Sequence, residues 1–297
     1  MQKNMNDHTF LQIFKGKCFT KNYVKKYQKV LAFDLDETLG SFAHLNVLWS
    51  GIIKLKNIPD PQNLFNKILD LYPEFIRYGI LNILDYLYMK KKEGELDKLY
   101  IYTNNRCRPP WVSFIARYFE YKMNINEDLF DKIISAFKIN NKVIEVNRTS
   151  RKKTYSDFIS CTVLPKTTEI CFIDNTYYNE MLNEKVYYIQ PRAYIHDLTI
   201  KQIIERFIHS DISKEFIDEM ENANRLRSYL NDWFLSNDSI DVVELEKTTI
   251  DFLVAQKMMY HIKEYFYLTN RKDKTRKMRI KLTRTTRKKT SEQMFSE

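Results

Sequence analysis

The stretch VLAFDLDETLG, residues 30–40, places four apolar residues directly before two aspartates that stand two positions apart. A short apolar run that ends in polar residues is typical of a buried parallel strand, which is covered on both faces. Residues 30–33 therefore predict a strand that delivers Asp34 and Asp36 at its carboxyl end.

Four similar runs follow along the chain, and segments with helical spacing of apolar residues separate them. We expect further strands over residues 99–102, 131–136, 170–173 and 186–189. We expect helices over residues 63–71, 80–91, 109–119, 154–160 and 198–208. This alternation favours an α/β fold with a parallel sheet between two helical layers. After residue 210 only helical patterns remain, over 215–234 and 242–268.

These patterns divide the chain into an N-terminal segment (1–27), an α/β domain (28–209), a helical extension (210–270) and a basic tail (271–297). The tail holds eleven Lys/Arg and three acidic residues, so its net charge of +8 accounts for most of the +10 of the chain. Such a run is normally solvated and disordered. It also suits contact with nucleic acid, or nuclear localisation through residues 287–289.

The composition favours an intracellular protein of the cytoplasm or nucleus. The four cysteines form no CxxC pair and no metal-ligand spacing, as expected for reduced thiols. The N-terminus has no apolar signal region, and no apolar run approaches the roughly 20 residues that span a bilayer. Secreted and membrane-spanning proteins are therefore not the expected classes.

Asp34 and Asp36 form the pair of carboxylates that phosphoryl transfer can use. One carboxylate, kept ionised by a divalent metal, attacks phosphorus, while the other carries a proton to the leaving oxygen and later takes one from water. Two like charges close together raise one pKa, which suits the proton carrier. A solvated acidic turn is the alternative interpretation of this pair.

Other predicted strands bring further polar groups to the same edge of the sheet. Thr103 follows the strand over 99–102 and can hydrogen-bond a phosphoryl group, and Asp174 follows the strand over 170–173 and can complete a Mg²⁺ site. A lysine must neutralise the phosphoryl oxygens. We favour Lys153, which directly precedes a predicted helix, and keep Lys152 as the alternative.

In order, these segments read VLAFDLDETLG, LYIYTNN, RKKTYSDF and ICFIDN. The set resembles the four motifs of the haloacid dehalogenase (HAD) superfamily over about residues 28–208. DLDETL and FIDN are most similar to the phosphatases of the RNA polymerase II C-terminal domain (CTD) and the NLI-interacting-factor-like phosphatases. Residues 75–80 resemble the R-P-G helix start of these phosphatases, with Tyr78 in place of proline. Similar proteins occur in large DNA viruses.

The resemblance implies a Rossmann-like HAD core and a role for each motif. Asp34 is implied as the nucleophile and Asp36 as the general acid/base. The residues implied to bind the phosphoryl group are Thr103, Asn104 and Lys153. The implied ligands of Mg²⁺ are Asp34, the Asp36 carbonyl oxygen and Asp174, with Asn175 beside them.

The expected function is Mg²⁺-dependent hydrolysis of a phosphomonoester through an aspartyl-phosphate. We expect a protein serine/threonine phosphatase, with a phosphoprotein such as the polymerase CTD as substrate. The gaps between the motifs leave room for a small cap or none, which suits a macromolecular substrate. The ending Thr103-Asn104-Asn105 departs from the T-A-S of the CTD phosphatases and is common in polynucleotide 3′-phosphatases, so a nucleic-acid 3′-phosphatase is the second hypothesis. A non-catalytic module that binds protein or nucleic acid is the third.

Overall fold

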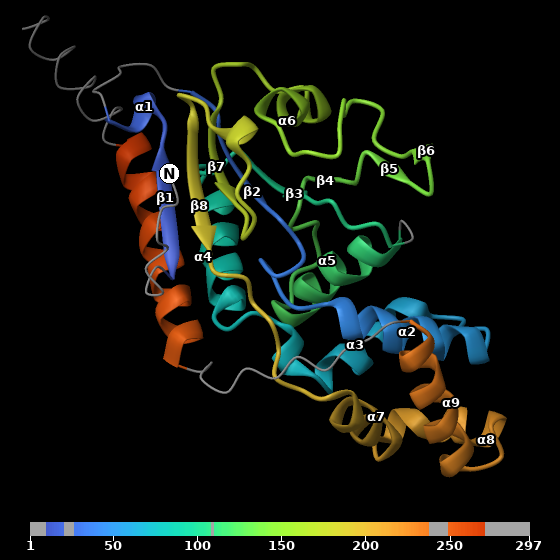
Figure 1. Cartoon of the computed structure of the whole chain (residues 1–297). Helices are drawn as coiled ribbons and strands as arrows, with labels where there is room; N and C mark the ends of the chain where they lie inside the picture. Colours follow the sequence, from blue (N-terminus) through green and yellow to red (C-terminus); the bar gives the residue numbers. More distant parts are fainter. Residues whose placement is uncertain (1–9, 21–26, 108–109, 238–248, 271–297) are drawn as a thin grey trace, which may run out of the picture.

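The computed structural model describes residues 10–20, 27–107, 110–237 and 249–270. The protein has an α/β fold around a six-stranded sheet (Figure 1) with the strand order β1-β8-β7-β2-β3-β4. Only β1 is antiparallel to its neighbour. The strands of this sheet are β1 (Leu11–Lys15), β2 (Lys29–Phe33), β3 (Lys98–Tyr102), β4 (Lys132–Ile134), β7 (Glu169–Ile173) and β8 (Val186–Pro191). A separate hairpin consists of β5 (Lys138–Ile139) and β6 (Lys142–Val143).

Helices connect and cover these strands. The α-helices are α1 (Lys17–Thr20), α2 (Ala43–Leu55), α3 (Pro61–Asp70), α4 (Ile80–Lys92), α5 (Pro110–Lys122), α6 (Tyr155–Thr162), α7 (Ile200–Ile208), α8 (Lys214–Glu219), α9 (Ala223–Ser236) and a C-terminal helix over 249–270. Single 3-10 turns occur at η1 (Pro73–Phe75), η2 (Asn179–Met181) and η3 (Asp211–Ser213). Within the described ranges, no helix is both long enough and apolar enough to cross a membrane.

Strand β2 occupies the middle of the sheet because all of its side chains are buried and both of its edges are paired in parallel, with β3 and β7. The chain first adds β3 and β4 on one side of β2, and then returns to add β7 and β8 on the other side. The direction of winding thus reverses at β2. Parallel sheets bind ligands at the carboxyl ends of strands near such a reversal, which is where Asp34 lies.

Alternate side chains of β2 enter two different cores. Leu31 and Phe33 pack in a core shared with α4, α5 and the C-terminal helix, whereas Val30 and Ala32 pack in a core shared with α6. The helices therefore cover both faces of the sheet, as the alternation of predicted strands and helices indicated. All five predicted strands, and the five helices predicted before residue 210, are present at these places.

The C-terminal helix runs alongside β1 (Figure 1) and joins the larger of the two cores. Its Glu264 carboxylate accepts hydrogen bonds from Lys15 Nζ at 2.6 Å and Tyr187 Oη at 2.5 Å, and lies 3.0 Å from His261 Nδ1. Partial burial alone would raise the pKa of the Glu264 carboxyl, but these hydrogen bonds lower it to about 2. Residues that sequence analysis placed in an extension thus cover the sheet.

A group of helices formed by α2, α3, α7, α8 and α9 lies together at the lower right of Figure 1. Trp233 of α9 donates from Nε1 to the Val47 carbonyl of α2 at 3.0 Å. Gly51 permits this approach, since a Cβ there would lie 2.8 Å from the Trp233 ring. The single helix predicted over 215–234 is wrong, because Glu221, with φ of 68°, separates α8 from α9.

Two further expectations fall partly or wholly outside the described residues. The helix predicted over 242–268 is seen from residue 249 onward, and its first residues lie outside the described ranges. The basic tail at 271–297, with its expected disorder and nucleic-acid contact, also lies outside them.

Candidate functional site

The turn after β2 is closed by contacts from two other parts of the chain. Asp34 donates its backbone N–H to the Ile173 carbonyl of β7 at 2.8 Å, which keeps the ends of β2 and β7 together. Thr38 Oγ1 accepts the Asn175 backbone N–H at 3.0 Å and donates to Asn175 Oδ1 at 2.9 Å. Glu37 has φ of 59°, a conformation that reverses the chain directly after Asp36.

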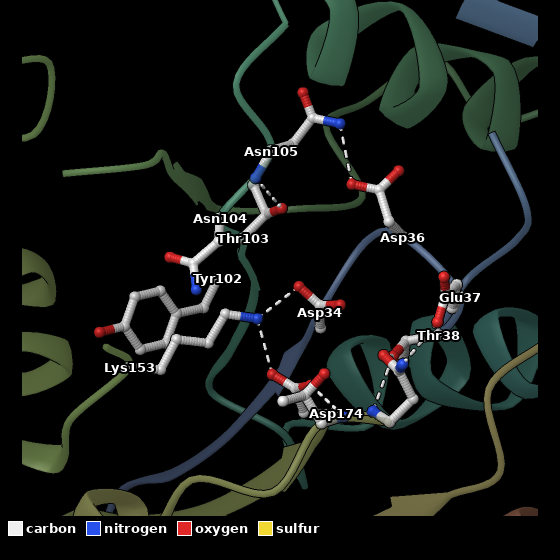
Figure 2. A network of polar contacts seen from close by, with 12 residues as sticks. Asp34, Asp36, Glu37, Thr38, Tyr102, Thr103, Asn104, Asn105, Lys153 and Asp174 are labelled. Carbon is white, nitrogen blue, oxygen red and sulfur yellow. Dashed lines mark hydrogen bonds and ion pairs between the residues drawn. The ribbon is translucent and has the colours of Figure 1, made fainter. Parts of the chain in front are cut away.

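Asp34, Lys153 and Asp174 form a buried ionic cluster at the centre of the site (Figure 2). The Lys153 ammonium donates to Asp34 Oδ1 and, at 2.6 Å, to Asp174 Oδ2. Burial favours the neutral amine, but the charges of Asp174 and Asp34 outweigh it and raise the pKa of Lys153. Burial also raises the pKa of the Asp174 carboxyl, against the effect of Lys153. Two carboxylates thus share one cation away from water.

Lys153, rather than Lys152, supplies this cation. Lys153 directly precedes α6, whose N-cap Thr154 accepts the backbone N–H of Asp157 at 3.0 Å. Its Nζ lies 5.5–6.0 Å from the centres of three surrounding aromatic rings, those of Tyr102, Phe172 and Tyr178. The Lys152 side chain is 68% exposed and pairs with Glu180 at 2.6 Å. The structure therefore separates the two alternatives that the sequence left open.

Asp36 lies apart from the ionic cluster and faces a cleft. Its Oδ2 accepts a hydrogen bond from Asn105 Nδ2 at 2.8 Å (Figure 2). Burial raises the pKa of the Asp36 carboxyl to about 6, with a smaller contribution from the charge of Asp34. Asp36 can therefore hold a proton close to neutral pH, while Asp34 contacts a buried ammonium.

The end of β3 brings Thr103 and Asn104 to the same edge of the sheet. Thr103 is buried, and its Oγ1 accepts the Asn105 backbone N–H at 2.9 Å. Asn104 accepts from Arg148 at 2.7 Å and donates to Tyr178 Oη at 3.0 Å, so its amide is held by the protein. The predicted strand end is confirmed. The side chain of Asn104, which the resemblance implied to bind the phosphoryl group, is hydrogen-bonded within the protein to Arg148 and Tyr178.

Arg148 was not predicted from the sequence, and it holds this loop in place by hydrogen bonds. Its guanidinium donates to the carbonyls of Thr103 at 3.0 Å and Ser135 at 2.8 Å, as well as to the side chain of Asn104. The group is buried and lies 4.9 Å from the centre of the Tyr102 ring. In the sequence Arg148 belongs to a basic run, which gives no sign that one member is buried.

Arg77 was also missed, and it holds the turn after β2 from the other side. It is buried and donates to the carbonyls of Thr38 at 2.6 Å, Arg192 at 2.8 Å and Glu37. Burial lowers the pKa of the Arg77 guanidinium to about 10. The resemblance of residues 75–80 to a known helix start was the only signal in the sequence that pointed to this region.

The ionic cluster contains two of the three oxygen donors that were expected to hold Mg²⁺. Asp34 and Asp174 present carboxylate oxygens to a single positive charge, and the carbonyl of Asp36 follows Asp34 by two residues. No group of three His, Cys, Asp or Glu side chains within the described residues could hold a metal. The expected set differs from such a group because one of its three oxygens is a backbone carbonyl. Asn175 contacts Thr38 and Glu37 rather than the carboxylate of Asp34 or Asp174.

A cleft of about 460 Å³ opens beside Asp36. Its lining comes from the turn after β2, the first turn of α2, the loop after β3 and the start of α5. The lining residues are Asp36, Glu37, Ser41, Phe42, Ala43, Asn46, Val47, Asn104, Asn105, Arg106, Cys107 and Trp111. Asp36 thus faces a space of molecular size, whereas Asp34 and Asp174 are more deeply buried. Comparison of the chain with models of protein families, with curated proteins and with solved structures gave no match.

Proposed function

We propose that this protein is a HAD-like phosphatase that hydrolyses phosphomonoesters through an aspartyl-phosphate on Asp34. One observation carries the proposal: Asp34 and Asp174 share the buried ammonium of Lys153, while Asp36 stands apart at a cleft with a raised pKa. A solvated acidic turn, the alternative interpretation of the aspartates, has neither a buried lysine nor a second strand end beside it. The four motif segments that resemble the HAD set meet at this edge.

The two aspartates divide the reaction between them. A carboxylate oxygen of Asp34 attacks phosphorus, and the bond from phosphorus to the leaving oxygen breaks while Asp36 gives its proton to that oxygen. Water then attacks the phosphorus of the acyl phosphate, Asp36 takes the proton from water, and phosphate leaves with Asp34 restored. The proton that Asp36 takes from water replaces the one that it gave to the leaving oxygen, so Asp36 ends the cycle protonated.

Other residues of the chain stabilise the phosphoryl group while it is transferred. Lys153 contacts Asp34 directly, so its positive charge lies beside the position of the attacking oxygen. Thr103 stands at the neighbouring strand end, on a loop that Arg148 holds by several hydrogen bonds. Such groups are in place before the reaction and need no reorganisation when charge develops.

Mg²⁺ fits the same set of oxygens. Asp34, the Asp36 carbonyl and Asp174 would hold the ion, since Mg²⁺ is commonly bound by one or two carboxylates together with substrate phosphate and water. When bound, it supplies Lewis-acid stabilisation of the phosphoryl oxygens. Asn175 would act indirectly, by fixing Thr38 and Glu37 in the turn between the ligands.

Within this chemistry we propose a CTD-phosphatase-like protein serine/threonine phosphatase. Asp36 borders a cleft with an exposed rim that includes Glu37, Ala43 and Arg106, so a phosphorylated residue within a longer chain can reach it. The second candidate is a nucleic-acid 3′-phosphatase, because the loop Thr103-Asn104-Asn105 departs from the CTD-phosphatase pattern. The tail at 271–297 would give either enzyme a basic arm.

Substitution of Asp34 by Asn tests the proposal. We expect Asp34→Asn to abolish Mg²⁺-dependent phosphate release from an aryl phosphate, while circular dichroism shows an intact fold. Asp128→Asn, at an exposed position outside the site, is the matched control and should keep the wild-type rate. Full activity of Asp34→Asn would refute the mechanism. A phosphoserine peptide and a 3′-phosphorylated oligonucleotide, compared under the same conditions, separate the two candidates.

A further inference from the structure

The leaving group of the proposed reaction must enter the cleft beside Asp36. A general acid has to lie within hydrogen-bond reach of the oxygen that it protonates. Asp36 lines the cleft, whereas Asp34 and Asp174 are turned toward Lys153. The cleft therefore receives the part of the substrate that remains after the phosphoryl group is removed, and its lining decides which leaving groups fit.

The polar side chains of the lining differ in whether the described residues give them a partner. Asn104 and Asn105 are committed to Arg148, Tyr178 and Asp36. By contrast, neither the guanidinium of Arg106 nor the side-chain amide of Asn46 has a hydrogen bond or ion pair with any residue that the structure describes. Arg106 is exposed and Asn46 is half-buried, so both can contact a ligand.

The same wall of the cleft contains the N-terminus of a long helix. Helix α2 has 13 residues, and its N-cap Phe42 makes no side-chain capping hydrogen bond. Its first backbone N–H groups therefore lack the partner that a Ser, Thr, Asp or Asn cap would provide, and the helix dipole adds a partial positive charge at this end. Ala43, Asn46 and Val47 of its first two turns line the cleft.

Trp111 forms a closed part of this wall. It lines the cleft at the start of α5 and is only 3% exposed. Its indole N–H has no hydrogen-bond partner in the described part of the chain.

These observations favour a peptide over a nucleic acid. Proteins that bind single-stranded nucleic acid without base pairing commonly stack bases on exposed aromatic rings. The aromatic residues of the lining, Phe42 and Trp111, are 1% and 3% exposed and offer no such face. The smaller Ala43 and Val47 remain available for contact with a peptide backbone and its Cβ atoms.

We propose that the cleft selects phosphoserine or phosphothreonine segments that carry a second negative charge next to the phosphorylated residue. Arg106, Asn46 and the N-terminus of α2 bind this second charge, either a carboxylate or another phosphate. This inference rests on the proposed phosphatase activity and names the substrate class of that site. Asp36 and Glu37 line the part of the cleft nearest the reaction, so the second charge binds on the α2 and Arg106 side.

The experiment compares two phosphoserine peptides that differ only in whether the flanking residues are Glu or Gln, using the full-length protein with Mg²⁺. We expect the wild type to prefer the Glu peptide in kcat/KM by about fivefold, the upper range for an exposed ion pair, and high salt to reduce this preference. Arg106→Gln should lower the Glu/Gln ratio below about twofold, mainly through KM. Arg117→Gln, on an exposed position of α5 outside the cleft, should keep the wild-type ratio.

The outcomes separate failure of the inference from failure of the proposed function. If the wild type hydrolyses both peptides with equal kcat/KM, the second subsite is wrong and the phosphatase proposal stands. If neither peptide nor an aryl phosphate is hydrolysed with Mg²⁺, the proposed function itself fails. A 3′-phosphorylated oligonucleotide that is preferred over the Glu peptide, with the preference lost in Arg106→Gln, would overturn the peptide class.

Discussion

Replacement of Lys153 by Met should destabilise the protein strongly, because it removes the only charge that the described structure places against two buried carboxylates. The Lys153 ammonium contacts both Asp34 and Asp174, and all three side chains are buried. Removing one partner of a buried ion pair typically costs about 3–5 kcal/mol, since the remaining charge stays desolvated. For a chain of this size each kcal/mol lowers the unfolding midpoint by about 2–4 °C, so we expect a decrease of about 6–20 °C.

The pH dependence of this loss has a definite sign. Burial raises the folded-state pKa of the Asp174 carboxyl, and loss of Lys153 removes the charge that opposes this effect. Groups with a raised folded pKa stabilise the fold below the unfolded pKa, and this stability is lost as pH rises through the folded pKa. Lys153→Met should therefore differ most from the wild type near pH 8 and least near pH 4.

The assay is thermal unfolding followed by circular dichroism at both pH values, without added metal. Lys152→Met is the matched control: its ion pair with Glu180 is exposed, so we expect no measurable change in the unfolding midpoint. Adding Asp174→Asn to Lys153→Met removes one of the unpaired charges and should restore part of the midpoint. A Lys153→Met protein that unfolds at the wild-type temperature at pH 8 would refute this reasoning.

Three further substitutions test other parts of the structure. Arg148→Lys keeps the charge but loses the fork that binds the loop at Asn104, so we expect a loss of about 2–4 kcal/mol in urea unfolding and a lower phosphatase rate. Arg77→Met leaves several backbone carbonyls without a donor and should lower stability by about 3 kcal/mol or more; an unchanged urea midpoint would contradict its role. Glu264→Gln should cost about 1–2 kcal/mol at pH 7, because the folded pKa of about 2 lies below the unfolded value; the difference should vanish as pH falls from about 4.5 through 2.

Sequence periodicity predicted β2, β3, β7 and β8 because each is short and apolar, with nearly all of its side chains buried. The run at residues 30–33 is apolar at every position and therefore needs cover on both faces, as a strand in the middle of a sheet has. Strand β2 lies there with every side chain buried. The rule that parallel strands end at one edge then placed Asp34, Thr103 and Asp174 in one region. These are local patterns combined with one general property of parallel sheets, so they needed no knowledge of the tertiary contacts.

Elements without a strong local pattern were missed. Strand β1 is five residues long, is only partly buried, and forms by pairing with β8, about 175 residues away in the chain. The hairpin of β5 and β6 has two residues in each strand, and its turn depends on Asn140 and Asn141 with φ of 47° and 62°. Such short elements are set by pairing and turn geometry rather than by periodicity.

The sequence by itself determined that this chain builds an α/β fold around a mostly parallel sheet and that two aspartates follow one of its fully buried strands. It also determined the order of the polar segments that follow, because strand ends are marked locally by the change from apolar to polar residues. Only the tertiary structure decided between Lys152 and Lys153. It also placed Arg77 and Arg148 in buried positions beside the loops of the site, and it brought Arg106 and α2 together in one cleft. The physical reason is that burial and charge pairing depend on which distant segments meet. The identity of a basic residue does not tell whether its side chain is exposed or buried.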